Sequence, residues 1–185
     1  VSPERQRYRA AWAREVGALL DELEALLATG RFRGIGELSL VHDATPGFAA
    51  TEVALDGPLA RGVFALARRY RVPLLLHVEA SHRAALELRL AADADVDVVW
   101  AHAGYLGAAD ARTVLERHPR LVHDLSARTW PRHPRAMAYP IVDAEGRLEP
   151  AWRTLILAFP DRFVGGTDAS HQDPDIISSL GLWDR

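Results

Sequence analysis

The stretch VPLLLHVE, residues 72–79, is an apolar run that ends in polar side chains, the first of them His77. A second run, VDVVWAHAGY at residues 96–105, reaches His102, and a third, FVGGTDAS, reaches Asp168. Strands that are apolar throughout are typical of parallel sheets covered on both faces. In a parallel α/β barrel, the carboxyl ends of such strands carry the active site. The pattern therefore predicts an α/β protein whose strand ends present functional side chains.

Strands and helices alternate along the chain. Apolar runs predict strands at about residues 34–40, 72–78, 96–101, 121–125 and 162–167. Helical spacing of apolar residues predicts helices at about residues 3–30, 59–70, 82–92, 108–117, 152–159 and from 174 onward. Such alternation indicates one parallel sheet covered by helices, and we expect a single domain over residues 1–185. The 185 residues are fewer than the ~250 of a complete eight-unit barrel.

Composition favours a small-molecule substrate. The chain is 49% hydrophobic and 25% charged, with a net charge of −3, which argues against a nucleic-acid partner. It has no cysteine, so thiolate ligation of zinc is excluded and the eight histidines and the carboxylates are the candidate metal ligands. No apolar stretch approaches the ~20 residues of a membrane span, and the amino end is too charged for a signal peptide. We expect a soluble protein without a membrane partner, and a cytoplasmic location is favoured.

Five segments together resemble the amidohydrolase-related branch of the metal-dependent amidohydrolase superfamily. They are GIGELSL, VPLLLHVEA, VVWAHAG, LVHDLSAR and DRFVGGTDAS, in the family's order, from about Arg31 to the end of the chain. The resemblance implies a distorted (β/α)8, TIM-barrel-like domain of which about five βα units are present. It places Glu37 on the fourth strand, His77 after the fifth, His102 after the sixth and Asp168 after the eighth.

The resemblance also implies a chemistry. Imidazoles and carboxylates suit Zn²⁺ or a similar divalent ion, which lowers the pKa of bound water from 15.7 to about 7. The implied metal residues are Glu37, His77, His102 and Asp168, and we expect them to gather at the carboxyl ends of the strands. Asp168 would accept the water proton and pass it to the leaving group. His102 is either a ligand or, in a one-metal site, a donor to the developing oxyanion.

The predicted function is a metal-dependent hydrolase that acts on a C–N or C–O bond of a small molecule, with decarboxylation as a variant. Two alternatives stay open. One is a nuclease resembling the TatD-like deoxyribonucleases, in which a strand-four glutamate joins the metal site; the net charge of −3 argues against it. The other is a non-catalytic barrel that keeps the fold without the metal.

One feature of the family pattern is missing. Family members carry a His-x-His pair at the end of the first strand, and the sequence contains no such pair. Since the first three strands also lack a counterpart and the chain begins at Val1, we expect it to be the carboxyl-terminal part of a longer protein. An open sheet exposes its edges, so association into a homo-oligomer is a further expectation.

The candidate residues also have structural interpretations. A strand-end histidine is often a hydrogen-bonded structural residue, Asp168 can cap the following turn, and Glu37 needs a metal, a cation or solvent. Arg128 and Trp130 follow the seventh strand in a long loop of the kind that lines substrates, and Arg128 either holds a substrate carboxylate or is a solvated arginine. The other histidines are expected to be structural or at the surface: His42, His82, His118, His123, His133 and His171.

Overall fold

The computed structural model describes residues 16–44, 49–128, 141–166 and 168. The chain divides into two compact units, Val1–Val99 and Trp100–Arg185, and passes from one to the other within strand β4 (Val98–Trp100). The single domain expected from the sequence stays a prediction. Trp130 and the predicted final helix lie outside the described residues.

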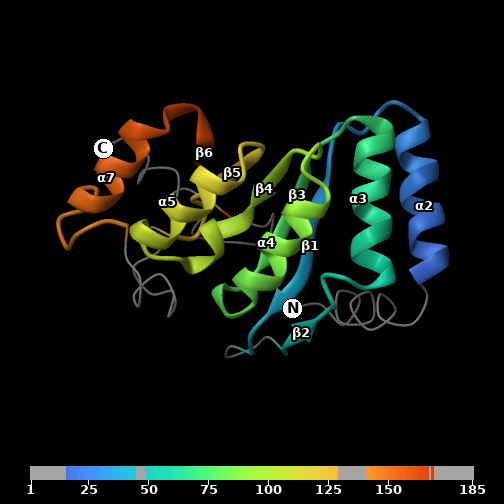
Figure 1. Ribbon diagram of the computed structural model, residues 1–185, viewed down its shortest axis with the longest axis horizontal. Coiled ribbons are helices and arrows are strands. Elements are labelled where there is room, and N and C mark those ends of the chain that lie inside the picture. The colour runs from blue at the N-terminus through green and yellow to red at the C-terminus, as the bar shows by residue number, and fades with distance from the viewer. Residues whose placement is uncertain (1–15, 45–48, 129–140, 167, 169–185) are drawn as a thin grey trace. The chain divides into compact units, whose positions relative to one another are not determined.

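The first unit contains a largely parallel sheet (Figure 1). Its strands run in the order β2 (Thr51–Glu52), β1 (Ile35–His42), β3 (Leu74–Val78) and β4. Strands β1 and β3 are parallel, with Leu38 opposite Leu76 and Ser39 opposite His77. This pairing confirms the predicted parallel α/β arrangement. The antiparallel strand β2 is not among the predicted strands, because two residues are too few to form a recognisable apolar run; it pairs with the end of β1.

Helices pack against this sheet and against one another. Helix α3 (Pro58–Tyr70) contacts β1 and β3, and α2 (Val16–Ala28) lies alongside α3 (Figure 1). The inner face of α3 is fully buried at Ala60, Val63 and Phe64 because apolar residues recur there at helical spacing. A side chain at Gly62 would collide with Leu20, so the glycine lets the two helices approach closely. A short 3₁₀ turn, η1 (Ala80–His82), then leads into α4 (Arg83–Ala92).

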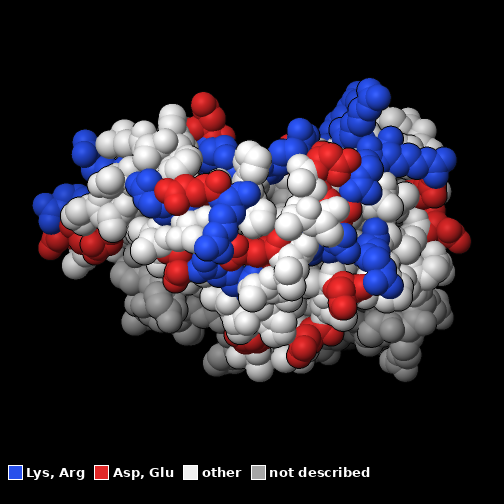
Figure 2. Space-filling model, viewed as in Figure 1, with Lys and Arg blue, Asp and Glu red and all other residues white. Residues whose placement is uncertain are grey.

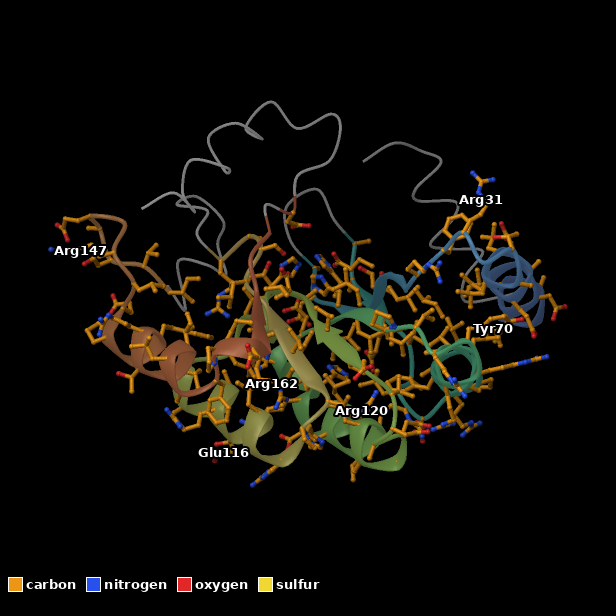
Figure 3. All side chains as sticks on the ribbon, turned by 90° about the horizontal axis from the view of Figure 1, so that it is seen from above. Arg31, Tyr70, Glu116, Arg120, Arg147 and Arg162 are labelled. Atoms are coloured by element: carbon orange, nitrogen blue, oxygen red, sulfur yellow. The ribbon has the colours of Figure 1, made fainter. Side chains whose placement is uncertain are left out.

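The second unit contains the parallel pair β5 (Leu121–Asp124) and β6 (Phe163–Val164), with Asp124 opposite Val164. Its helices are α5 (Ala108–Arg117) and α7 (Pro150–Ala158), with 3₁₀ turns η2 (Ala101–Tyr105) and η3 (Pro160–Arg162). Arg162, labelled in Figure 3, donates hydrogen bonds to the carbonyls of Leu121 and His118 at 2.6 Å each. This side chain therefore connects η3 to the beginning of β5.

The described elements agree closely with those predicted from the sequence. Five predicted helices correspond to α2, α3, α4, α5 and α7, with α2 described from Val16 onward, and the five predicted strands correspond to β1, β3, β4, β5 and β6. Helix α7 begins at Pro150, two residues before the predicted start, because proline is well suited to the first turn of a helix. Within the described part of the chain, no helix has both the length and the apolar character that crossing a bilayer requires.

Candidate active site

His77 lies near the carboxyl end of β3 between two carboxylates. Its Nδ1 is 3.0 Å from Oε1 of Glu37, and its Nε2 is 3.1 Å from Oε1 of Glu79. The imidazole is 8% exposed, whereas the side chains of Glu37 and Glu79 are 30% and 3% exposed. A neutral imidazole carries one N–H and can donate to only one of these carboxylates. The arrangement therefore brings one imidazole and two carboxylate oxygens together, a donor set that can bind a cation.

Strand geometry explains how the three side chains meet. Glu79 follows His77 by two residues and so points to the same face, as alternation along an extended chain requires. Glu37 lies two residues before Ser39, which pairs with His77 across the parallel ladder. A Cβ at Gly36 would lie 2.6 Å from the carbonyl oxygen of Leu75, so the glycine permits the close approach of β1 and β3 beside the site.

His42 ends β1 and joins the same group. Its ring centroid is 5.1 Å from that of His77. His42, His77 and Glu79 each offer a ligand atom, and these atoms all lie within 4.8 Å of one another. Two imidazoles and a carboxylate are a donor set that suits Zn²⁺ and similar ions. The residues present therefore fit the divalent metal that the sequence implies.

Sequence analysis missed His42 and Glu79 as candidates. His42 is the last residue of a strand, at the same carboxyl end as His77, and the strand was predicted to end two residues earlier. Glu79 has the two-residue spacing from His77 that places both on one face. Strand-end position and alternation would have identified both residues.

The second unit places His102 in a left-handed turn. The φ angles of His102, Ala103, Gly104 and Tyr105 are 56°, 48°, 58° and 56°. Each non-glycine residue in this conformation costs about 1–2 kcal/mol. A side chain at Gly104 would collide with the indole of Trp100, so glycine is needed there for space as well as conformation. Backbone strain of this kind is concentrated at functional sites and persists only where the surroundings hold it.

Arg128 supplies much of that support. Its Nη1 donates to the carbonyl of His102 at 3.0 Å and its Nη2 to the carbonyl of Leu106 at 2.9 Å, at the two ends of the turn. The guanidinium lies 5.0 Å from the ring centre of Trp152 and 5.8 Å from that of Tyr105, and the residue is 1% exposed. Burial lowers the pKa of Arg128 to about 10, which leaves it cationic at neutral pH. The substrate contact predicted for Arg128 stays a prediction, and its observed bonds hold the His102 turn.

The His102 ring has a defined tautomer. Its Nδ1 lies 2.9 Å from the carbonyl oxygen of Ser126, which can only accept, so Nδ1 carries the hydrogen and donates. In the neutral ring, Nε2 is then the atom with the lone pair. This nitrogen is 4.0 Å from Oδ2 of Asp168. The side chain of Asp168 is 36% exposed, so the pair combines a buried imidazole with a carboxylate that solvent reaches.

Asp124 fixes the backbone around His102. Its Oδ2 accepts a hydrogen bond from the backbone N–H of His102 at 3.2 Å, and its Oδ1 accepts one from the N–H of Ser126 at 3.1 Å. The hydroxyl of Ser126 donates to the same carboxylate. A Cβ at Gly166 would lie 3.2 Å from Oδ1 of Asp124, so the glycine makes room for this carboxylate beside the end of β6.

His123 faces the opposite side of β5, as strand alternation predicts. It is fully buried, and its Nε2 donates to the carbonyl of Ala111 at 3.3 Å. Burial is the main cause that lowers the pKa of His123 to about 4, and the nearby Arg128 and Arg162 act in the same direction. His123 is therefore a neutral structural residue at physiological pH.

The structure brings the predicted site residues together in two pairs. Glu37 and His77 meet in the first unit, and His102 and Asp168 meet in the second. Convergence of all four on one ion stays a prediction, and Trp130 lies outside the described residues.

Comparisons with known proteins find a family match and a structural neighbour. A family model described as Amidohydrolase matches residues 2–185. Among solved structures, an uncharacterized TIM-barrel protein from Bordetella bronchiseptica is similar, with a TM-score of 0.52 and 16% identity. The alignment covers 76% of this chain and 48% of that one, so this chain spans about half the length of its structural relative. No curated protein matches. The likeness confirms the predicted fold class, an α/β fold of the TIM-barrel type.

Proposed function

Because the chain belongs to the amidohydrolase family, we propose that it contributes to a metal-dependent hydrolase that acts on a C–N or C–O bond of a small molecule. Decarboxylation at the same kind of centre is a variant of this proposal. The observation that carries it is the pairing of His102 and Asp168, in which the Nε2 lone pair of a tautomerically fixed imidazole faces an accessible carboxylate at 4.0 Å.

For metal binding we propose His77 with Glu37, on the fit of the donor set that surrounds His77. A divalent ion bound there, with Zn²⁺ favoured by nitrogen and oxygen ligands, would lower the pKa of a water from 15.7 to about 7 and polarise a carbonyl. Ligation by His102 and Asp168, which the family resemblance implies, is a further part of the proposal.

Asp168 is proposed as the group that moves the proton. As a carboxylate it accepts a proton from the attacking water, and as a carboxylic acid it returns that proton to the leaving group. His102 is proposed to act through Nε2, because its Nδ1 is committed to the carbonyl of Ser126. In its protonated form, the same Nε2 donates to the oxyanion that develops on the substrate.

Surface charge supports a small-molecule substrate over a nucleic acid. On the face drawn in Figure 2, arginines and acidic side chains are interspersed among the described residues and do not gather into a broad basic surface. Together with the net charge of −3, this is a poor electrostatic match for a phosphate backbone.

The test is hydrolysis of a panel of small amides, esters, lactones and aryl carboxylic acids with Zn²⁺ added, and single- and double-stranded DNA as a separate arm. Replacing Asp168 with Asn is expected to lower kcat by at least 10²-fold, since an amide cannot accept the water proton. Asp161→Asn, an exposed change in η3, is the matched control. Cleavage of DNA alone would favour the nuclease, and a folded, metal-loaded chain inactive on every substrate would contradict the proposal.

A further inference from the structure

Resting on the proposed function, in which His102 acts through Nε2, we propose that Asp124 is a positioning residue that acts on His102 through the hydroxyl of Ser126. Asp124 accepts the hydroxyl hydrogen, so Oγ of Ser126 presents a lone pair to Nδ1 of His102 and the imidazole hydrogen stays on Nδ1. All three residues belong to the second unit. The proposal gives a role to two residues, Asp124 and Ser126, that sequence analysis did not include among the candidate site residues.

The segment that ends β5 holds His102 at three points. The backbone N–H of His102 donates to Oδ2 of Asp124 at 3.2 Å, and its carbonyl accepts from Nη1 of Arg128 at 3.0 Å. Its ring nitrogen Nδ1 lies 2.9 Å from the carbonyl oxygen of Ser126 and 3.1 Å from Oγ of the same residue. Residues 124, 126 and 128 therefore fix both the backbone and the ring of His102, and Nε2 lies 4.0 Å from Oδ2 of Asp168.

The direction of the Ser126 hydroxyl decides what the ring meets. Oγ donates its hydrogen to Oδ2 of Asp124. A hydroxyl has one hydrogen and two lone pairs, so Oγ can then only accept from Nδ1. Oδ2 of Asp124 is 3.8 Å from Nδ1, beyond hydrogen-bond distance, so the carboxylate acts on the ring through the hydroxyl. The Nδ1–H is thereby shared between two acceptors of Ser126, its carbonyl oxygen and its Oγ.

A hydroxyl released from the carboxylate would favour the other tautomer. By donating to Nδ1 it would stabilise the neutral ring whose hydrogen is on Nε2, and Nε2 would then have no lone pair for a proton. The tautomer of a functional histidine is set by the hydrogen bond that its other nitrogen makes. Asp124 is therefore expected to keep the lone pair on Nε2, the nitrogen that faces Asp168.

Burial makes the network depend on the carboxylate. His102, Asp124 and Ser126 are all buried. The carboxylate accepts from three donors, the backbone N–H of His102, the backbone N–H of Ser126 and the Ser126 hydroxyl. An amide of the same size offers one acceptor oxygen and an NH₂ group that only donates. Asp124→Asn is therefore the change that releases the hydroxyl while it conserves the volume of the side chain.

The test is the tautomer of His102 in the full 185-residue chain, read from the ¹⁵N chemical shifts of histidine-labelled protein. It is measured without substrate, with chelator present and above the ordinary histidine pKa of about 6.5. His102→Gln identifies the signals of this ring. The wild type is expected to show a protonated Nδ1 and an unprotonated Nε2, and Asp124→Asn is expected to raise the population of the Nε2–H form.

The double variant Asp124→Asn with Ser126→Ala is expected to restore the Nδ1–H form. It removes the released hydroxyl and leaves the carbonyl of residue 126 as an acceptor, a recovery that general loss of stability would not produce. The controls are Asp161→Asn and Thr154→Val, exposed changes in η3 and α7 of the same unit. Both are expected to keep the wild-type tautomer.

Kinetics supply a second readout on any substrate that the hydrolysis panel identifies. Asp124→Asn is expected to lower kcat roughly 10–100-fold and to change KM less than about threefold, because an incorrect tautomer impairs the reaction more than binding. The double variant is expected to recover part of this loss in kcat.

Ser126→Ala is the milder change, and it tests the same contact if circular dichroism shows that Asp124→Asn does not fold. It is expected to keep the Nδ1–H form and to speed solvent exchange of that hydrogen at least about tenfold, since one acceptor is lost. A wild-type ring with its hydrogen on Nε2, an unchanged tautomer in folded Asp124→Asn, or wild-type exchange in Ser126→Ala would overturn the proposal. The expected tautomers without turnover on any substrate would count against the hydrolase and support the positioning of the ring.

Discussion

At the residue scale, the buried guanidinium of Arg128 supports the backbone of the His102 turn in the second unit. Both of its Nη groups donate to backbone carbonyls, those of His102 and Leu106, and its guanidinium lies near two aromatic rings. Hydrogen bonds from charged groups are worth about 1.5–3 kcal/mol each, comparable with the strain of the left-handed residues between those carbonyls. Arg128 is therefore placed to hold His102 in position.

Replacing Arg128 with Met is expected to destabilise the chain by roughly 3 kcal/mol or more, because two buried carbonyls lose charged donors. In an active form of the enzyme, kcat is expected to fall more than KM rises, since His102 is displaced. Urea unfolding and steady-state kinetics measure both effects, with Arg153→Met, an exposed change in α7, as the control. A rise in KM alone, confined to substrates with a carboxylate, would instead support substrate binding by Arg128.

His123 is the residue expected to make stability depend on pH. Its pKa is about 4 in the folded chain, below the ordinary value of 6.5. The unfolded chain therefore binds more protons between these values, so stability is full above pH 6.5 and falls as pH drops toward 4. The loss attributable to His123 is roughly 3 kcal/mol.

The measurement is urea unfolding from pH 4 to 7.5 for the wild type and His123→Gln, which keeps a donor for the carbonyl of Ala111. The variant is expected to show a shallower decline on acidification, and His82→Gln should follow the wild type. Parallel curves for the wild type and His123→Gln would show that other groups cause the pH dependence.

At the scale of elements, turn η2 determines where the His102 ring points. Residues 102–105 have positive φ, and a right-handed turn would direct the chain after β4 differently. The orientation of the His102 ring therefore depends on this left-handed conformation. Gly104 is the point where the turn meets Trp100. The turn therefore depends on one residue without a side chain.

Gly104→Ala is expected to destabilise the chain by roughly 2–4 kcal/mol, from a positive φ and a collision with Trp100. Gly107→Ala is the control, because Gly107 has ordinary dihedrals and a Cβ there meets nothing within 4 Å; its effect should stay below about 1 kcal/mol. Thermal unfolding and the tryptophan fluorescence spectrum check both variants. Equal effects at the two glycines would mean that the left-handed turn is not under strain.

At the scale of the whole molecule, metal binding and stability are coupled. The ion proposed for the first unit needs ligands from β1 and from the end of β3, and these come together only in the folded chain. A ligand that binds only the folded state stabilises it by about 2.7 kcal/mol at a concentration of 100 times its Kd.

Zinc at that excess is therefore expected to raise Tm by roughly 5–10 °C, and a chelator should reverse the rise. Differential scanning calorimetry with zinc, with magnesium and with chelator measures the effect. His77→Asn is expected to show no response to zinc, whereas His82→Asn should respond like the wild type. A Tm that zinc leaves unchanged would contradict metal binding in the first unit.

The sequence by itself determined the elements and the family. Apolar runs and helical spacing locate β1, β3, β5 and their helices within a few residues, because burial on both faces of a parallel sheet requires continuous apolar strands. Strand-end positions also identified His77, His102 and Asp168 as the polar residues to examine. These are properties of short segments, which local patterns describe well.

Only the tertiary structure decided which polar groups meet. Strand register places His77 between Glu37 and Glu79, with His42 beside it. Packing between segments distant in sequence buries Arg128 against the His102 turn. The sequence treated His42 as structural and Arg128 as a loop residue, because exposure and contact are set by packing between segments. Composition and periodicity carry no information about those distances, whereas the free energy of a buried charge depends on them directly.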